Sequence, residues 1–321
     1  MNKFFKKAAA VSGILAMTVS FSASAFAAEF TDMPNNWTTS ALENAVKNGL
    51  LYGEENADGK GMSIKPDDRI TRAQMAAIIV RAFGANETAD ISSYTDVDKD
   101  AWYYKELSKA VAMNAFRGDG NKMNPQNNIT FQECFTVISQ VLQLQIYQKN
   151  TACLDKFSDK SDIASWAVPY AAAVVGSGFW DGIDGKILPT EYITRSQFAV
   201  LMDKTVKTYI TEPGTYSDFE DGNVMVRCDD VIISGADIKG DIIVGDGVSN
   251  KGFTLDNSKA SRYMFIRGGG ENVKMQNNAF VDRVILINPG ITLSIDATSD
   301  AVSGGYTSHS SDRILITPAL E

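Results

Sequence analysis

The sequence predicts a multidomain protein in which an α-helical repeat region is followed by an all-β module. Three observations support this order. The same landmarks recur 64 and 63 residues apart over the first two thirds of the chain. Helical spacing of apolar residues stops after Ile210. Short β-prone strings then recur every 20 to 22 residues.

The first 27 residues have the order of a secretory signal peptide. Three lysines precede an apolar run from about Ala8 to Met17, and Ala25-Phe26-Ala27 fits the small-x-small cleavage rule. The alternative, an uncleaved membrane anchor, is disfavoured because small residues interrupt a run that is already short for a bilayer. We therefore expect residues 1–27 to be removed, the mature chain to be secreted, and no transmembrane span to remain.

Composition restricts the partners and the chemistry. Removal of residues 1–27 takes away three lysines and no acid, so the formal charge changes from -9 to about -12. A chain this acidic is not expected to bind nucleic acid, and any anion must be held by a local basic site. The three cysteines are too few for a disulfide framework. The single histidine, His309, is expected to be exposed, so we expect no catalytic triad, metal or cofactor.

Each repeat carries the same landmarks in the same order. An aromatic-x-aspartate opening is followed by a tryptophan, by a glycine after a short apolar segment, by a proline, and by a threonine five residues after the proline. We place the repeats at residues 30–85, 94–144 and 157–210 of a domain spanning 28–210. A linker at 211–222 and a β module at 223–321 follow. The aspartates are Asp32, Asp96 and Asp159, and the tryptophans are Trp37, Trp102 and Trp166.

Each repeat is predicted to form two helices joined by a loop. The second helix begins at the threonine, because Thr71-Arg72-Ala73-Gln74 and Thr194-Arg195-Ser196-Gln197 match a capping box. In that motif the threonine hydroxyl accepts from the third helical amide, and the glutamine bonds back to the threonine amide. Units this small do not bury an apolar face alone, so we expect them to pack into a single domain.

These landmarks, with the motifs Ile70-Thr71-Arg72-Ala73-Gln74 and Ile193-Thr194-Arg195-Ser196-Gln197, resemble the S-layer homology (SLH) family. The resemblance covers about residues 30 to 210. It implies a pseudo-threefold bundle with binding grooves between neighbouring units. It also implies anchoring of a surface protein to an anionic secondary cell-wall polysaccharide, often one that bears pyruvate ketals, and allows contact with other surface-layer proteins.

Capping alone does not explain an arginine at the first helical position. A cation there opposes the helix dipole at a cost of about 0.3–1 kcal/mol. Free amides at a helix N-terminus bind anions, and a guanidinium adds a fork for carboxylate or phosphate. We therefore interpret Arg72 and Arg195, with Gln74 and Gln197, as candidate polysaccharide-binding residues; the alternative is a solvated surface arginine. Unit two has Phe131 at this position, so its groove is expected to bind poorly.

Two further sets of candidate polysaccharide-binding residues have alternative interpretations. Trp37, Trp102 and Trp166 either stack on sugar rings or fill the core at the start of each first helix. The aspartates of the three openings (Asp32, Asp96 and Asp159) are interpreted as N-caps or turn-forming residues. The alternative for them is direct contact with the polysaccharide.

The β module is predicted to be a short parallel β-solenoid of about three coils, because its strand-like strings repeat at a regular period. An antiparallel sandwich is the alternative. We expect the module to fold separately and to have no catalytic residues, with Arg227 and Arg267 as the arginines able to reach a polymer. The alternative function is a wall-anchored carbohydrate-active enzyme that uses some of Asp241, Asp246, Asp256 and Asp282.

Overall fold

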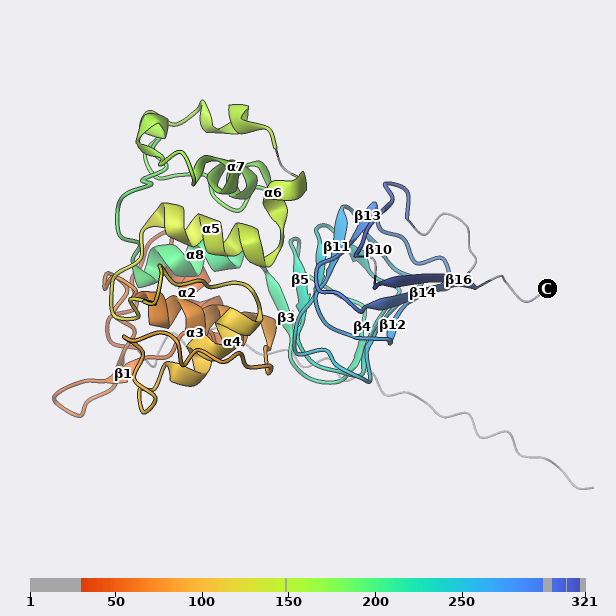
Figure 1. Cartoon of the computed structure of the whole chain (residues 1–321), viewed down its shortest axis with the longest axis horizontal. Coiled ribbons are helices and arrows are strands. Elements are labelled where there is room, and N and C mark those ends of the chain that lie inside the picture. Colours follow the sequence, from red (N-terminus) through yellow and green to blue (C-terminus); the bar gives the residue numbers. More distant parts are fainter. Residues whose placement is uncertain (1–29, 148, 297–301, 310, 318–321) are drawn as a thin grey trace, which may run out of the picture.

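A helical bundle packs against a parallel β-solenoid in this computed structural model (Figure 1). The structure describes residues 30–147, 149–296, 302–309 and 311–317. The expected signal peptide lies outside these residues. The order of the two parts, helical repeats and then β-solenoid, confirms the predicted fold class.

Each repeat contains two main helices, as predicted. In every unit a long loop separates the first helix from the second. Unit one contains α2 (Thr39–Lys47), the hairpin β1 (Glu54–Glu55) and β2 (Met62–Ser63), and α3 (Arg72–Phe83). Unit two contains α4 (Tyr104–Ala112) and α5 (Phe131–Val141), followed by α6 (Leu144–Tyr147). Unit three contains η1 (Thr151–Leu154), η2 (Lys160–Asp162), α7 (Val168–Gly176) and α8 (Arg195–Thr205).

The second helix of each unit begins with the predicted capping box. The side chains of Gln74, Glu133 and Gln197 accept hydrogen bonds from the amides of the N-cap threonines at 2.9, 2.8 and 2.9 Å. The capping box therefore marks the start of each second helix correctly from the sequence.

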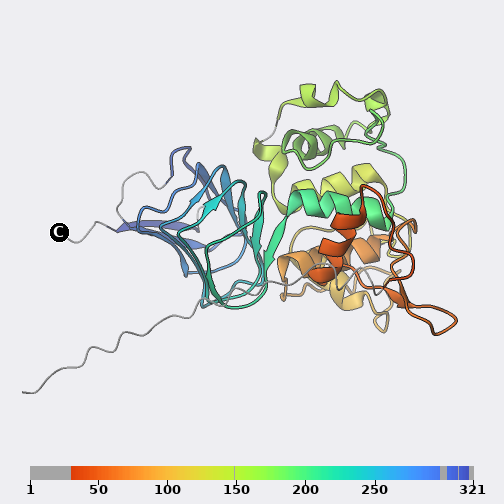
Figure 2. The ribbon, with the colours of Figure 1, turned by 180° about the vertical axis from the view of Figure 1, so that it is seen from behind.

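The three units close into a ring. Helix α3 packs on α4, α5 packs on α7, and α8 packs back on α2 of the first unit (Figure 2). At the centre, the amide of Ile70 donates to the carbonyl of Ile193, that of Ile193 to Ile129, and that of Ile129 to Ile70, each at 3.1 Å. All three isoleucine side chains are fully buried. Closure of the ring gives the bundle its pseudo-threefold arrangement.

The C-terminal module is a three-sided parallel solenoid. Every strand pairing in it is parallel, which rules out the sandwich alternative. Sheet one contains β3 (Thr208–Ile210), β5 (Val224–Val226), β8 (Ile242–Val244), β11 (Tyr263–Ile266), β13 (Arg283–Leu286) and β15 (Tyr306–Thr307). Sheet two contains β4 (Gly214–Tyr216), β6 (Val231–Ser234), β9 (Phe253–Asp256), β12 (Val273–Gln276), β14 (Thr292–Asp296) and β16 (Arg313–Thr317). The third side contains β7 (Asp237–Ile238) and β10 (Lys259–Ala260).

The solenoid is longer than the sequence predicted. Sheets one and two each have 6 strands, so the expected three coils are too few. The difference arises at both ends. Strands β3 and β4 lie on either side of the expected start of the linker, and each pairs with a later solenoid strand. Strands β15 and β16 extend the sheets beyond the strings that the sequence pattern singled out.

The four central strands of sheet one, β5, β8, β11 and β13, are buried on both faces. Their inward residues, such as Val224 and Val226, line the solenoid core. Their outward residues Met225, Ile243, Phe265 and Ile285 stand in register on four strands and belong to the core of the helical bundle instead. Burial of each such side chain stabilises the folded chain by about 1.5–3 kcal/mol relative to exposure to water. The bundle and the solenoid therefore share a hydrophobic interface.

Polar side chains of the solenoid bind the C-terminal ends of the bundle helices. Arg227 donates to the carbonyls of Asn48 and Arg81 in unit one, at 2.8 and 3.0 Å. Arg267 donates to the carbonyls of Met113 (2.8 Å) and Val141 in unit two. A cation at a helix C-terminus satisfies carbonyls that lack an intrahelical partner and interacts favourably with the dipole.

Unit three is bound in a similar way, by the side-chain amide of Asn223, which donates to Thr205 at the end of α8 at 2.9 Å. One expectation is therefore wrong. Arg227 and Arg267 are not available to a polymer, because both are used at the interface. The packing also argues against a separately folding module, since isolation would expose the outward row of sheet one and leave helix ends without their partners.

Replacing the buried interface arginine tests this coupling. In Arg267→Met, Asp246 loses the guanidinium that binds it at 2.6 Å, and two helix ends lose their donors. We expect the free energy of unfolding to fall by about 3–5 kcal/mol. Lys274→Met, on the exposed face of sheet two, is the control and should change it by less than about 0.5 kcal/mol.

Urea unfolding measures the stability of both parts. Tryptophan fluorescence monitors the bundle, and hydrogen exchange of the strands monitors the solenoid. All four tryptophans lie in the bundle, so fluorescence reports that part alone. Coincident transitions are expected for the wild-type chain. Two separate wild-type transitions, or equal stability of Arg267→Met and the control, would contradict the coupling.

Candidate functional site

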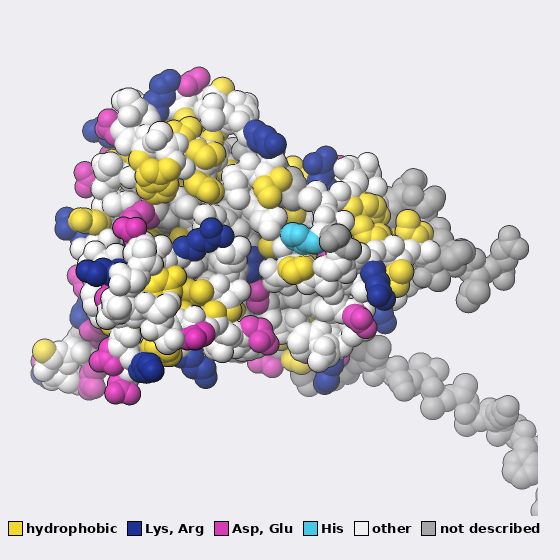
Figure 3. Space-filling model, viewed as in Figure 1, with side chains coloured by type: hydrophobic (Ala, Val, Ile, Leu, Met, Phe, Trp, Pro, Cys, Tyr) yellow, Lys and Arg dark blue, Asp and Glu magenta, His cyan; other side chains and the backbone are white. Residues whose placement is uncertain are grey.

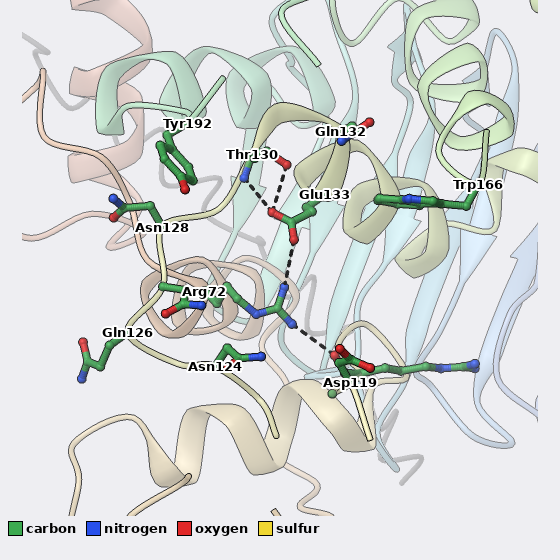
Figure 4. Close-up of a pocket in the computed structure, with 13 residues that line it drawn as sticks. Arg72, Asp119, Asn124, Gln126, Asn128, Thr130, Gln132, Glu133, Trp166 and Tyr192 are labelled. Atoms are coloured by element: carbon green, nitrogen blue, oxygen red, sulfur yellow. Dashed lines mark hydrogen bonds and ion pairs between the residues drawn. The ribbon is translucent and has the colours of Figure 1, made fainter. Parts of the chain in front are cut away.

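A pocket of about 750 Å³ lies where the three units meet on the surface of the bundle (Figure 4). Unit one contributes the first residue of α3, unit two contributes the loop before α5 and its first turn, and unit three contributes two aromatic side chains. The lining residues are Arg72, Arg117, Gly118, Asp119, Asn124, Gln126, Asn127, Asn128, Thr130, Gln132, Glu133, Trp166 and Tyr192.

Arg72 connects two units at the floor of this pocket. Its Nε donates to the carbonyl of Met123 at 2.9 Å and its Nη2 to that of Arg117 at 3.2 Å, both in unit two. Its Nη1 lies 3.7 Å from the Glu133 carboxylate. Figure 4 shows the guanidinium extended along the pocket between this carboxylate and the loop of unit two. Arg72 is therefore a bridge between units as well as a lining residue.

Arg195 makes the corresponding bridge from unit three to unit one. Its Nε donates to Ile64 at 2.7 Å and its Nη2 to Tyr52 at 2.8 Å. Burial lowers the pKa of this guanidinium, while the nearby carboxylates of Glu54 and Asp68 act in the opposite direction. The alternative of an isolated solvated arginine is wrong for both positions, because each guanidinium binds two carbonyls of the next unit.

The helix N-termini beside these arginines are not free anion sites. The amide of Arg72 donates to Asn127 and that of Ala73 to Pro125, both at 2.9 Å. The first two amides of α8 donate in the same way to Asp68 and Pro66 of unit one. The next amide in each helix donates to the capping threonine. The expectation of outward-pointing amides therefore fails, because the loop of the neighbouring unit occupies them.

Gln74 and Gln197 are used in the capping boxes, where their side-chain oxygens accept from threonine amides. Neither lines the pocket. Unit two has Glu133 in the equivalent position, and this residue both caps its helix and faces Arg72. The pocket is thus built around the one unit in which the capping residue is charged.

Phe131, at the position of the arginine in the other two units, packs against aromatic side chains. Its ring is 1% exposed and lies with its centroid 5.1 Å from the ring centroid of Trp180 in unit three. Phe135 adds a third ring, 6.0 Å from Phe131. Unit two therefore joins unit three through apolar contact where the other units use an arginine. The expectation that this groove binds poorly stays a prediction.

The repeated tryptophans are on the surface. Trp37, Trp102 and Trp166 are 58%, 58% and 51% exposed, so they do not fill the core. Trp166 lines the pocket, and Figure 4 shows its ring at one edge, on the side of Gln132 and Glu133. By the pseudo-threefold relation, Trp102 belongs with the Arg195 groove and Trp37 with the Phe131 groove. Surface rings remain available for stacking.

The repeated aspartates hold the loop of their own unit. Asp32 accepts from the amides of Ile64 and Lys65, at 2.7 and 2.8 Å. Asp96 and Asp159 bind the equivalent amides in units two and three. The second amide of each pair belongs to a residue with positive φ, namely Lys65 (51°), Asn124 (50°) and Leu188 (59°). The carboxylates therefore stabilise a left-handed conformation that is unfavourable for lysine and leucine.

The sequence reasoning missed the polar side chains of the unit-two loop. Asn124, Gln126, Asn128 and Gln132 line the pocket with amide groups. Arg117 adds an exposed guanidinium that takes part in no ion pair among the residues that the structure describes. The signal was present in the string Asn124-Pro125-Gln126-Asn127-Asn128, which contrasts with the charged Lys65-Pro66-Asp67-Asp68-Arg69 of unit one.

Charged side chains of both signs are dispersed over the face shown in Figure 3, without a broad basic area. Within the described ranges, no group of three His, Cys, Asp or Glu residues is placed to hold a metal ion. Among those same residues, no helix has the length and apolar character needed to cross a membrane.

The fold and site define a repeat protein whose three helical units close into a ring with a pocket between them. A family model described as the S-layer homology domain matches residues 29–76, 93–133 and 156–199. The helical region therefore consists of three S-layer homology domains. These domains indicate a cell-surface, cell-wall-associated protein.

Similar proteins include surface-layer proteins and enzymes. The chain is 26% identical over 217 residues to the Surface-layer 125 kDa protein of Lysinibacillus sphaericus, covering 66% of this chain and 18% of that one. It is 32% identical over 152 residues (44% and 13%) to the Surface layer protein of Brevibacillus choshinensis. It is 23% identical over 175 residues (54% and 16%) to Exoglucanase XynX of Acetivibrio thermocellus. The chain thus spans less than a fifth of the length of each of these relatives.

Truncating Phe131 should destabilise the bundle rather than alter a binding site. Phe131→Ala removes a fully buried ring from the contact with Trp180, and we expect a loss of about 3–5 kcal/mol in the free energy of unfolding. Phe131→Arg should be at least as harmful, because it places a charge among aromatic rings. Chemical denaturation measures both; stability within about 1 kcal/mol of wild type would contradict this packing role.

The Asp32 loop contact should make stability depend on pH. Burial raises the pKa of Asp32, but hydrogen bonds from Ser63 and from the amides of Ile64 and Lys65 outweigh this and place it below the ordinary value of 3.8. The contribution of the Asp32 carboxylate to the free energy of unfolding is therefore fully present at pH values above the ordinary pKa. It is lost as the pH falls through the folded-state pKa. We expect Asp32→Asn to be less stable than wild type at neutral pH, with a gap that closes on acidification. A gap independent of pH would contradict this assignment.

Proposed function

We propose that this protein is a non-catalytic surface protein that binds an anionic secondary wall polysaccharide, for example one bearing pyruvate ketals. The pocket around Arg72 carries the proposal. It combines amide side chains, two guanidiniums and an exposed tryptophan in one hollow on the bundle surface. The similarity to surface-layer proteins supports the same function.

The chemistry of the pocket suits a charged sugar. The side-chain amides both donate and accept hydrogen bonds, as sugar hydroxyls require. The ring of Trp166 offers an apolar face with a polar edge. Arg72 is partly neutralised by Glu133, whereas Arg117 is exposed and has its Nη2 held by Asn114 at 3.0 Å. Arg117 is therefore the cation best placed to bind a carboxylate on the polymer.

The grooves are not equivalent, and the proposal assigns them different roles. The Arg72 groove has the amide-rich lining described above. The Arg195 groove has the same bridge to the neighbouring unit but contains Glu54 and Lys65, which form an ion pair. The third groove is closed by Phe131 and Trp180. Two binding grooves on one bundle would give avidity for a repeating polymer.

The acidic residues of the solenoid support the non-catalytic part of the proposal. Asp241 is buried and is bound by Arg262 at 2.9 Å, and Asp246 is bound by Arg267. Asp256 accepts from Ser234 at 2.7 Å, and Asp282 accepts from Ser303 at 2.8 Å. Burial raises the pKa of Asp241, which its arginine partner opposes. Each of these carboxylates thus has a structural hydrogen bond.

Alanine substitution of the three surface tryptophans tests the proposal. Trp166→Ala and Trp102→Ala should weaken binding to purified walls about tenfold each, since stacked rings contribute about 1–1.5 kcal/mol. Trp37→Ala is a matched control, because it is equally exposed but belongs to the groove filled by Phe131. Co-sedimentation with walls, before and after chemical removal of the secondary polymer, gives the affinities. Equal affinity of all three variants and wild type would refute the assignment of the grooves.

Arg117→Gln provides the second arm of this experiment. It should weaken binding to the charged polymer and leave binding to a polymer stripped of its acidic substituents unchanged. The fold should be preserved, because this side chain is exposed. Equal losses on both polymers would show that the arginine does not recognise an anionic group.

A further inference from the structure

The last described coil of the solenoid leaves its core open. In sheet two, Ile314 and Ile316 are in register with Leu293 and Ile295 of the coil before. The inward residues of the earlier coils in these two columns are at most 3% exposed: Val231, Phe253, Val273 and Leu293 in one, and Ile233, Leu255, Met275 and Ile295 in the other. Ile316 is 64% exposed. A side chain that occupies a core column is therefore in contact with solvent.

The backbone of this coil also has an edge with which no described strand pairs. Among the described strands, β16 is the last of sheet two, on the side of the solenoid away from the bundle (Figure 1). The amide of Arg313 donates to Ile291 of the preceding coil at 2.9 Å. Because hydrogen bonds alternate in direction along a strand, the amides and carbonyls of Ile314 and Ile316 point to the free side. Such an edge is a template for another strand.

We propose that a second copy of this chain covers the edge, so that β16 pairs antiparallel with β16 of the copy about a twofold axis through Leu315. In this register Ile314 faces Ile316 of the copy, and both of these residues have their backbone groups on the free side. They exchange two hydrogen bonds, and the twofold axis repeats the pair. Leu315 faces its own counterpart at a position without backbone hydrogen bonds.

Several features of β16 favour its own copy as the partner. The sequence Ile314-Leu315-Ile316 has the same apolar pattern in both directions, as a twofold interface requires. Residues directly opposite in an antiparallel pair share a face, so the inward isoleucines of each copy close the open core of the other. The nearest charged residue, Arg313, is kept away from its counterpart because it lies two positions from the axis. A register shift of one residue would turn the isoleucines outward.

The dimer would carry two bundles. The effect of the dimer on wall binding rests on the proposed function, whereas the strand pairing itself does not. Two anchors on one assembly would increase avidity for the wall without a new contact to the polymer. The interface is small, a single strand pair with few side chains, so a dissociation constant on the order of 10 μM is expected.

Sedimentation velocity of the full chain over a concentration series tests the proposal. The wild-type chain should convert from monomer to dimer in the micromolar range. Ile316→Lys should raise the dissociation constant at least about tenfold, because it places a charge in the closed core. Ile232→Lys is the matched control: Ile232 is 40% exposed on the outer face of β6, an internal strand of the same sheet, and should dimerise like wild type. Both variants change exposed side chains, and their melting temperatures verify folding.

A cross-linking experiment tests the register. At a position without hydrogen bonds, facing Cα atoms lie about 4.5 Å apart, within the range of a disulfide. Leu315→Cys should therefore form a covalent dimer on mild oxidation, above the level given by the parent chain with its three native cysteines and by Ile232→Cys. A chain that stays monomeric, an Ile316→Lys variant that dimerises like wild type, or a Leu315→Cys variant that links no better than the control would each overturn the proposal. In those cases a different partner or segment covers the end coil.

Discussion

The helical part of the molecule depends on the closed ring of three backbone hydrogen bonds between Ile70, Ile129 and Ile193. These groups are buried, so each would carry a desolvation cost if the ring opened. The ring brings the loop of each unit against the second helix of its neighbour. The first two amides of that helix are then satisfied by loop carbonyls. The pocket follows from this closure, because its walls come from all three units.

The solenoid completes the opposite ends of the helices. Arg227, Arg267 and Asn223 bind carbonyls at the ends of five helices, and a row of apolar residues from sheet one joins the bundle core. Each second helix (α3, α5 and α8) is thus held at its N-terminus by a neighbouring unit and at its C-terminus by the solenoid. The solenoid is therefore part of the anchor's structure, and its outer face and end coil remain for other contacts.

Breaks in the repeat pattern distinguish the grooves from one another. Phe131 replaces an arginine and turns one junction between units into an aromatic contact. Glu133 replaces a glutamine, keeps the capping role and adds a charge opposite Arg72. The loop of unit two exchanges charged residues for amides. Three copies of one fold therefore present three different surfaces, and the shared landmarks maintain the geometry while the variable positions decide the chemistry.

The sequence alone determined the three units and the starts of their second helices, because capping boxes and turns are local patterns. Its strand period favoured a parallel solenoid, but the structure was needed to rule out the sandwich. Tertiary structure decided the site. The guanidiniums of Arg72 and Arg195 meet carbonyls of another unit, and Arg267 meets helices more than a hundred residues away. No local pattern encodes which unit follows which in the closed ring, or that sheet one turns its outer face to the bundle. Those contacts depend on packing between distant segments, where the same residue type serves either as a ligand group or as a structural bridge.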